Sequence, residues 1–164
     1  MYARSFIDSL DFARNGRIIS GEVRFSELPR LLDMLENPLG ILAYSVQGGV
    51  DKQGTHFLDV SMAGECSLRC QRCLSGFDYA IRLQTRLLLR DQASLVALDD
   101  DAEELDSILA DTHLDVLALM EEEILLSLPI APKHESGACR VTDGENGLGK
   151  ERNPFAVLAE LKRN

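Results

Sequence analysis

The chain has 164 residues, of which 45% are hydrophobic, and this size and composition suit a single domain with its own core. No apolar run is long enough for a membrane span and no secretory signal is recognisable, so we expect a cytoplasmic protein with reduced thiols and no membrane partner. The net charge of −10 is uneven: residues 91–150 hold 3 Lys/Arg against 15 Asp/Glu, whereas residues 1–90 hold 11 against 10. Nucleic acid could therefore bind only at a local patch on the first part of the chain.

The first predicted elements are a short helix followed by three strands. Leucines at helical spacing over residues 26–35, with Ser26 as N-cap and Pro29 in the first turn, predict the helix. From residue 41 the pattern has period two, which predicts a strand, a loop and a longer strand that runs into the cysteines. Residues 77–90 alternate apolar side chains with Arg82, Arg86 and Arg90, so the three arginines share one face of a third strand.

The second half of the chain predicts a loop, a helix, a linker and a last helix. Residues 91–111 are acidic and poorly periodic, which indicates a mobile loop. Apolar residues at helical spacing from 114 to 128 predict an amphipathic helix that ends before Pro129. Residues 136–152 read as a flexible linker and residues 153–164 as a C-terminal helix. We expect an α+β fold in which residues 1–135 form an antiparallel β-sheet or partial barrel with flanking helices, and the C-terminal helix is tethered.

Three of the four cysteines, Cys66, Cys70 and Cys73, fall within eight positions. Their spacing matches the iron–sulfur loop of radical SAM enzymes, but that chemistry needs a longer scaffold, and here Arg72 precedes Cys73 where an aromatic residue is usual and a strand follows. A thioredoxin-like Cys70-x-x-Cys73 pair would need a following helix to lower a thiol pKa, and a strand follows instead. We expect Cys66 to be a small buried residue of the core.

A zinc site is the metal hypothesis that these residues favour. Cys70 and Cys73 have the spacing of half a zinc knuckle, and His134 and Cys139 have the spacing of a second ligand pair. A tetrahedral site of three cysteines and one histidine would join the strands to the segment after the helix. The alternative is a metal-free turn with an exposed histidine, and the sequence leaves both open.

Three stretches resemble the YceD family, the large ribosomal RNA subunit accumulation proteins: CQRCLSGF (70–77), EEEILLSLPIAPKHESGAC (121–139) and NPFAVLAELKRN (153–164). The resemblance implies a role in the synthesis, processing or accumulation of large-subunit (23S) ribosomal RNA, without catalytic activity. Many members of the family carry a second cysteine pair near Cys139, where this sequence has only His134 and Cys139.

If the resemblance holds, the expected function is ribosome biogenesis by binding, and the expected partner is precursor large-subunit rRNA or a large-subunit ribosomal protein. No small-molecule substrate is expected. The candidate contact residues are five arginines of the strand region and three apolar residues of the last helix: Arg69, Arg72, Arg82, Arg86, Arg90, Phe155, Leu158 and Leu161. The alternative is a metal- or thiol-dependent enzyme centred on Cys70 and Cys73, for which the sequence offers no adjacent general base.

Overall fold

The computed structural model describes residues 5–96, 106–135 and 137–139. Their regular elements, in chain order, are β1 (Phe6–Ile7), α1 (Ser9–Arg14), β2 (Ile18–Arg24), a 3₁₀ turn (Phe25–Glu27), β3 (Ile41–Val50), β4 (His56–Arg69), β5 (Gly76–Arg90), α2 (Gln92–Val96), β6 (Ser107–Leu109), β7 (Leu114–Asp115) and α3 (Val116–Ser127). The α+β class expected from the sequence is confirmed. Apart from residues 137–139, the predicted linker lies outside the described residues, and so does the predicted C-terminal helix.

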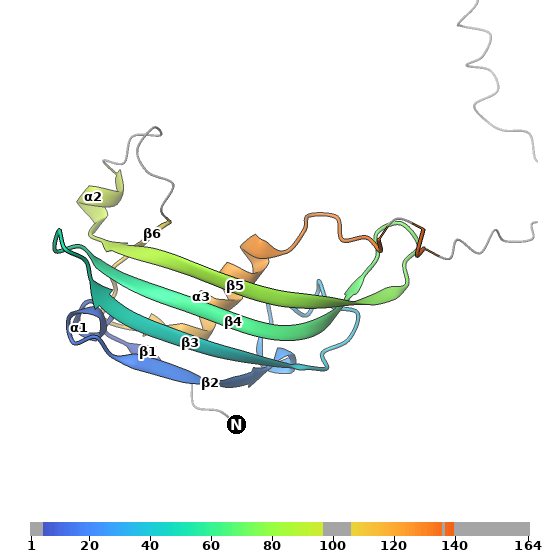
Figure 1. Ribbon diagram of the computed structural model, residues 1–164, viewed down its shortest axis with the longest axis horizontal. Coiled ribbons are helices and arrows are strands. Elements are labelled where there is room, and N and C mark those ends of the chain that lie inside the picture. Colours follow the sequence, from blue (N-terminus) through green and yellow to red (C-terminus); the bar gives the residue numbers. More distant parts are fainter. Residues whose placement is uncertain (1–4, 97–105, 136, 140–164) are drawn as a thin grey trace, which may run out of the picture.

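A curved sheet of five strands in the order β2-β3-β4-β5-β6 dominates the fold, and α3 crosses one of its faces (Figure 1). The strands β2 to β5 are antiparallel neighbours along the chain, and the pair β1–β7 forms a separate small sheet. The long strands β4 and β5 pair without interruption from Phe57–Leu88 to Arg69–Gly76. This hairpin carries the CQRC segment at its turn.

The segment 91–111 differs from the predicted loop, because α2 and β6 lie within it. Moreover, β6 pairs in parallel with Leu88–Arg90 of β5, which departs from an all-antiparallel sheet. Two parallel neighbours need a crossover of a dozen or more residues, and the 16 residues between β5 and β6 provide that length. The acidic composition masked this crossover in the sequence.

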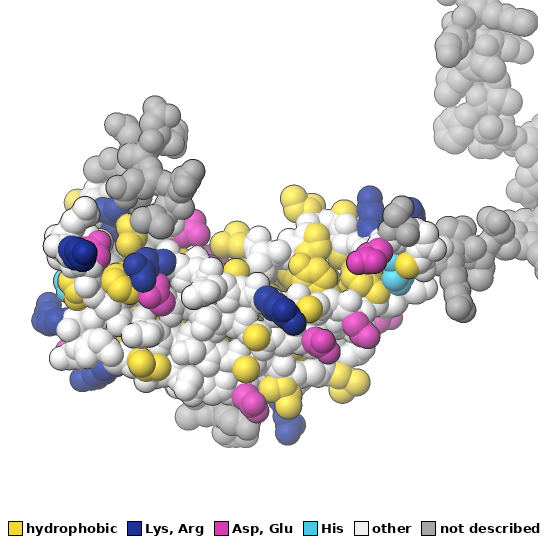
Figure 2. Space-filling view, viewed as in Figure 1, with side chains coloured by type: hydrophobic (Ala, Val, Ile, Leu, Met, Phe, Trp, Pro, Cys, Tyr) yellow, Lys and Arg dark blue, Asp and Glu magenta, His cyan; other side chains and the backbone are white. Residues whose placement is uncertain are grey.

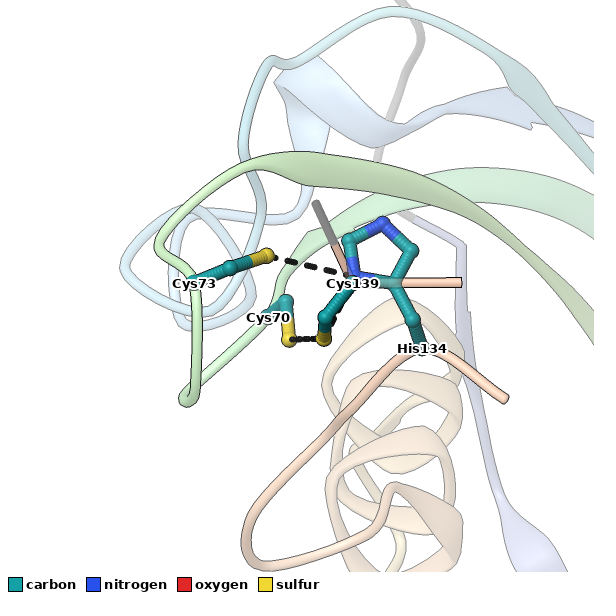
Figure 3. Close-up of side chains that lie close together, drawn as sticks. All are labelled: Cys70, Cys73, His134 and Cys139. Carbon is teal, nitrogen blue, oxygen red and sulfur yellow. Dashed lines mark hydrogen bonds between the residues drawn. The ribbon is translucent and has the colours of Figure 1, made fainter. Parts of the chain in front are cut away.

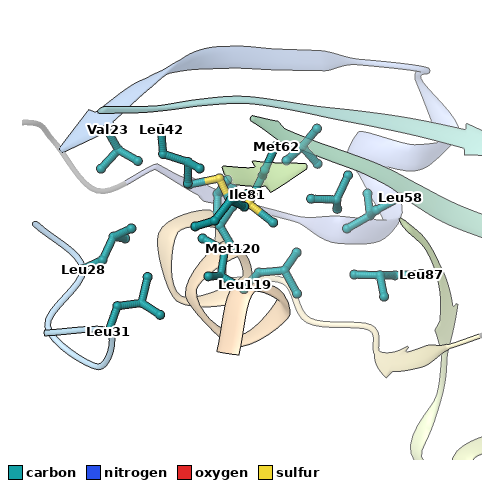
Figure 4. Close-up of a cluster of buried hydrophobic side chains, with 14 of the residues drawn as sticks. Val23, Leu28, Leu31, Leu42, Leu58, Met62, Ile81, Leu87, Leu119 and Met120 are labelled. Atoms are coloured by element: carbon teal, nitrogen blue, oxygen red, sulfur yellow. The ribbon is translucent and has the colours of Figure 1, made fainter. Parts of the chain in front are cut away.

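The helix α3 matches its prediction and supplies one wall of the core. Its N-cap is Asp115, whose carboxylate accepts hydrogen bonds from the N–H groups of Leu117 (3.0 Å) and Ala118 (3.3 Å). The helix ends two residues before Pro129, which cannot continue it. Its buried face, which includes Leu119 and Met120, packs against the apolar side chains of the strands (Figure 4).

The helix predicted for residues 26–35 is wrong. The chain forms the 3₁₀ turn and then successive turns in which the N–H groups of Leu31 and Met34 each donate to the carbonyl three residues earlier. A spacing of three residues therefore buries Leu28 and Leu31 without an α-helix. The buried carboxylate of Glu121 on α3 holds this segment by accepting a hydrogen bond from the Arg30 backbone N–H.

Candidate metal centre

The first pair of candidate ligands lies on the turn between β4 and β5. The Cys70 N–H donates to the Ser75 carbonyl and the Leu74 N–H donates to the Cys70 carbonyl, each over 2.9 Å. Leu74 has a φ of 61°, in the left-handed region that side chains other than glycine rarely adopt. This tight turn brings the side chains of Cys70 and Cys73 to the same side of the hairpin end.

The second pair follows α3 in a segment that returns to the same turn. The Gln71 N–H donates to the Pro132 carbonyl over 2.8 Å, which joins the turn to this segment. The ring of His134 packs against Phe77 at the start of β5, with ring centroids 5.0 Å apart and an interplanar angle of 43°. These contacts place His134 and Cys139 opposite the first pair.

The four candidate ligand atoms form one compact group, in which all lie within 4.8 Å of one another. The Sγ atoms of Cys70 and Cys139 are 3.5 Å apart, and Nδ1 of His134 lies 3.4 Å from Cys73 Sγ and 3.5 Å from Cys139 Sγ (Figure 3). Bond lengths of about 2.3 Å to sulfur and 2.0–2.1 Å to nitrogen put tetrahedral ligands roughly 3.5–3.8 Å apart. Three of the separations are therefore close to those that a tetrahedral ion requires, and this group could hold a metal.

Neighbouring groups stabilise a thiolate at Cys70. Burial alone would raise the pKa of its thiol, but hydrogen bonds from the backbone N–H groups of Cys73, His134 and Arg72, and from the His134 side chain, lower the pKa to about 5. Burial, together with the adjacent Cys70 and Cys73, raises the pKa of the Cys139 thiol, although Arg72 acts in the opposite direction. Thiols this close together would lose their protons when a metal ion binds, because the positive charge of the ion offsets the repulsion between neighbouring thiolates.

Arg72 provides a cation beside the cluster. Its Nε donates to Cys139 Sγ over 3.1 Å, and this hydrogen bond raises the pKa of the guanidinium above its ordinary value. Three thiolates and a neutral imidazole around a divalent ion carry a net charge of −1. The guanidinium would offset that charge if an ion were bound, and its hydrogen bond orients the Cys139 side chain, as partners of metal ligands commonly do.

Cys66 does not belong to the group. It lies on β4, opposite Tyr79 of β5, and its side chain is buried in the hydrophobic core. Burial raises the pKa of its thiol to about 11, so it stays protonated. The three-cysteine iron–sulfur arrangement is therefore not assembled. A strand and not a helix follows Cys73, as expected, so the pKa of the Cys70 thiol is lowered by backbone N–H groups and the His134 side chain and not by a helix N-terminus.

Most of the candidate contact arginines have partners within the chain. Arg69 contacts Glu36 over 2.6 Å, and Arg86 makes two hydrogen bonds of 2.7 Å to Asp59. The Arg86 guanidinium also lies 4.0 Å from the centre of the Phe57 ring. Arg90 donates to Ser107. The predicted face of β5 carries Arg82, Arg86 and Arg90, but these arginines do not form a row of unengaged cations. The other candidate contact residues, Phe155, Leu158 and Leu161, lie outside the described part of the chain.

The spacing of the cysteines found all four members of the group, but it missed the residues that support them. Arg72 is a predicted contact residue for a partner, and the structure adds a contact with Cys139 that the sequence did not indicate. The left-handed backbone of Leu74 was also missed, because glycine usually occupies such a position. The alternating pattern predicted only that Phe77 lies on a strand. It did not indicate the contact of Phe77 with His134.

Comparison with known proteins places the described site within a family. The family model of YceD, "Large ribosomal RNA subunit accumulation protein YceD", matches residues 58–162, which include both ligand pairs. The chain belongs to the YceD family. The match covers well over half of the 164 residues, and the name of the family links it to accumulation of the large ribosomal RNA.

A relative in Haemophilus influenzae extends the YceD match to nearly the whole chain. The protein named "Large ribosomal RNA subunit accumulation protein YceD" is 27% identical over 170 residues, which cover 96% of this chain and 94% of the relative. No solved structure matches the chain. Among the described residues, no helix is long and apolar enough to cross a membrane.

Proposed function

We propose that this chain is a ribosome-biogenesis factor that supports the synthesis, processing or accumulation of 23S rRNA by binding, without catalysing a reaction. The observation that carries the proposal is its membership of the YceD family over residues 58–162. The expected partners are precursor large-subunit rRNA or a large-subunit ribosomal protein. The cytoplasm is the compartment that suits this role.

We propose further that Cys70, Cys73, His134 and Cys139 bind zinc as a structural site. Three thiolates and one imidazole are a ligand set that zinc prefers, and three of their separations are close to those of tetrahedral ligands. Four protein ligands complete that tetrahedron and leave no position for a substrate, whereas catalytic zinc sites keep one position open. The closed set supports a binding role in preference to a metal-dependent enzyme. Bound zinc would cross-link the β4–β5 turn to the segment after α3.

The charges favour a protein partner over extended contact with bare RNA. The chain has a net charge of −10, and each lysine or arginine that already pairs with a carboxylate contributes less to binding phosphates. Arg69 and Arg86 are paired in this way, and Arg72 contacts Cys139. Arg82 is exposed and available for a partner, and the apolar residues Phe155, Leu158 and Leu161 are proposed as further contacts.

The test is a deletion strain in which the ratio of 23S to 16S rRNA and the subunit profile on gradients are measured. We expect less 23S rRNA and fewer large subunits, with recovery when the wild-type gene is returned. Returning Cys73→Ser should recover less than returning Cys66→Ser, since Cys66 lies outside the metal group. Unchanged 23S rRNA and subunit ratios in the deletion strain would refute the proposed function.

A further inference from the structure

Among the described residues, one edge of β5 has no neighbouring strand along most of its length. The strand runs over Gly76–Arg90, but β6 pairs only with Leu88–Arg90 (Figure 1). Strand edges of this length attract other extended chains, and proteins usually protect them with prolines, bulges, charged side chains or short strands. The pairing of β5 with β4 has no bulge and β5 contains no proline, although the charged side chains of Asp78, Arg82 and Arg86 lie along it. Between the start of β5 and β6, the edge is therefore suited to accept another strand.

The hydrogen bonds at the end of β5 show which backbone groups face this edge. The Leu88 N–H donates to the Asp106 carbonyl, and the Arg90 carbonyl accepts from the Ala110 N–H. Backbone groups of successive residues in a strand point to opposite sides, so the other even-numbered residues of β5 face the same way. These are Asp78, Ala80, Arg82, Gln84 and Arg86, whose backbone groups have no backbone partner on this side among the described residues. They extend over about 26 Å at about 3.3 Å per residue.

The side chains next to the edge define two faces for an incoming strand. Phe77, Tyr79 and Leu83 point toward the core side and are half-buried, so an added strand could cover them further. A pocket opens at the start of β5, between Phe77–Ala80 and the segment Pro129–Ala138 after α3. Figure 2 shows hydrophobic side chains gathered in this region, close to a histidine. An apolar side chain of the incoming strand would fit on this side.

The opposite face of the edge carries Arg82 at its centre, between the exposed Asp78 and Arg86, which is paired with Asp59. Arg82 is exposed, and it forms no ion pair with a carboxylate of the described residues. A residue that pairs with Arg82 across the edge would place its side chain on the same face. A carboxylate at that position is favoured, because opposite charges on neighbouring strands attract.

We propose that the open edge of β5 binds an extended segment of a partner protein by strand addition, and that this segment alternates apolar residues with acidic ones. The apolar residues cover the half-buried side of β5, and an acidic residue lies opposite Arg82. Backbone hydrogen bonds supply affinity and the alternating side chains supply specificity. This inference deepens the proposed function. It rests on that function for one point, the expectation that the partner takes part in ribosome assembly.

The first measurement is amide hydrogen exchange of the full chain, followed by NMR. The even-numbered amides from Asp78 to Arg86 should exchange at least about tenfold faster than those of Ile81 and Leu83, which bond to β4. Equal protection of both sets at every protein concentration would mean that another part of this chain covers the edge. Protection that grows with concentration would mean that a second copy covers it. Either result would overturn the proposal.

The second measurement adds capped nine-residue peptides that carry valine or threonine on the inward positions and glutamate or lysine on the outward ones. The glutamate peptide should slow exchange of the even-numbered amides, and the lysine peptide should bind at least about tenfold more weakly. Failure of every peptide to protect these amides would also overturn strand addition. The assay contains no RNA, so its failure leaves the rRNA role of the protein to be judged by the deletion strain.

A matched pair of variants at one position separates backbone pairing from side-chain effects. Gln84→Pro removes the edge N–H and should weaken the glutamate peptide at least tenfold, whereas Gln84→Ala keeps that N–H and should change affinity less than about twofold. Thermal unfolding checks that both variants fold. If Gln84→Pro does not fold, Arg82→Glu serves in its place, because it should reverse the preference between the two peptides. An unchanged preference in Arg82→Glu would refute the proposed site.

Discussion

The Nε atom of Arg72 lies 3.1 Å from the Sγ atom of Cys139, although the two residues are 67 positions apart in the sequence. Arg72 stands between Cys70 and Cys73, so the turn that provides one pair of candidate ligands also provides a cation for the other pair. The two halves of the site are therefore complementary in charge as well as in geometry. This relationship predicts that Arg72 contributes to metal affinity.

Replacing Arg72 with alanine should weaken zinc binding by about 10–100-fold, the range found when partners of metal ligands are removed. Arg72→Lys should recover part of the loss, because an ammonium keeps the charge but lacks the planar donor geometry. Competition with a chelator of known affinity measures the change. Arg69→Ala is the matched control, since Arg69 is exposed and contacts Glu36. Equal affinities in all three variants would exclude a role for Arg72 at the metal.

Cys73→Ser should abolish the binding of about one zinc per chain and lower stability by several kcal/mol, because the binding energy of a structural metal is part of the folding energy. Cys66→Ser should keep the zinc and lower stability less, since Cys66 is a small core residue. Elemental analysis and thermal unfolding, each with and without a chelator, measure both effects. Similar losses in the two variants would contradict a metal held by the four-residue group.

Leu74→Ile should destabilise the protein by about 1–2 kcal/mol, because a β-branched side chain is strained at a φ of 61°. Leu74→Gly should be neutral or stabilising, since glycine adopts this conformation without strain and the Leu74 side chain is 67% exposed. Urea unfolding of the zinc-loaded protein measures the free energy difference between the variants. A more stable Ile variant than Gly variant would show that the turn relaxes away from the left-handed region.

Glu123→Gln should stabilise the protein at pH 7. Burial, with the nearby Asp106 and Glu122, raises the pKa of the Glu123 carboxyl. The folded state therefore holds this proton more tightly than the unfolded chain, and stability falls as the pH rises from the ordinary glutamate pKa through the raised one. The melting temperature of Glu123→Gln should exceed that of the wild type at pH 7, and the difference should disappear near pH 4.

The exposed Glu22 on β2 provides the control for this pH dependence. Glu22→Gln should change the melting temperature little at either pH, since an exposed carboxylate has nearly the same surroundings in the folded and unfolded chain. If Glu123→Gln lowers the melting temperature at pH 7, the buried carboxylate must have a stabilising contact that outweighs its burial.

Period-two patterns predicted the long strands well, because one face of each is buried and the other is exposed. The strand from Gly76 to Arg90 has the alternation expected for residues 77–90, and α3 ends close to Pro129 as expected. Both signals depend on burial and on the covalent limits of proline, which act locally. Spacing along the chain likewise indicated the two pairs of candidate ligands, which the fold brings together.

The parts that sequence reasoning missed depend on contacts between distant residues. Leu28 and Leu31 have a helical spacing, but turns bury them equally well, and the contact between Arg30 and Glu121 helps to hold that shape. The pairing of Arg86 with Asp59 follows from the register of β4 and β5, which a single strand pattern does not contain. The parallel pairing of β6 is of the same kind, because it depends on where the chain returns.

Two of the candidate ligands precede α3 in the sequence and two follow it, and this order would determine when a metal ion can be enclosed during folding. Cys70 and Cys73 are brought together by a local turn, whereas His134 lies beyond α3 in the sequence, so we expect it to reach them only after the helix has packed on the sheet. An ion could be held weakly by the first two thiolates at an early stage, and full coordination would have to wait. Uptake of tightly held zinc during refolding would thus report the arrival of the helix, not the formation of the hairpin.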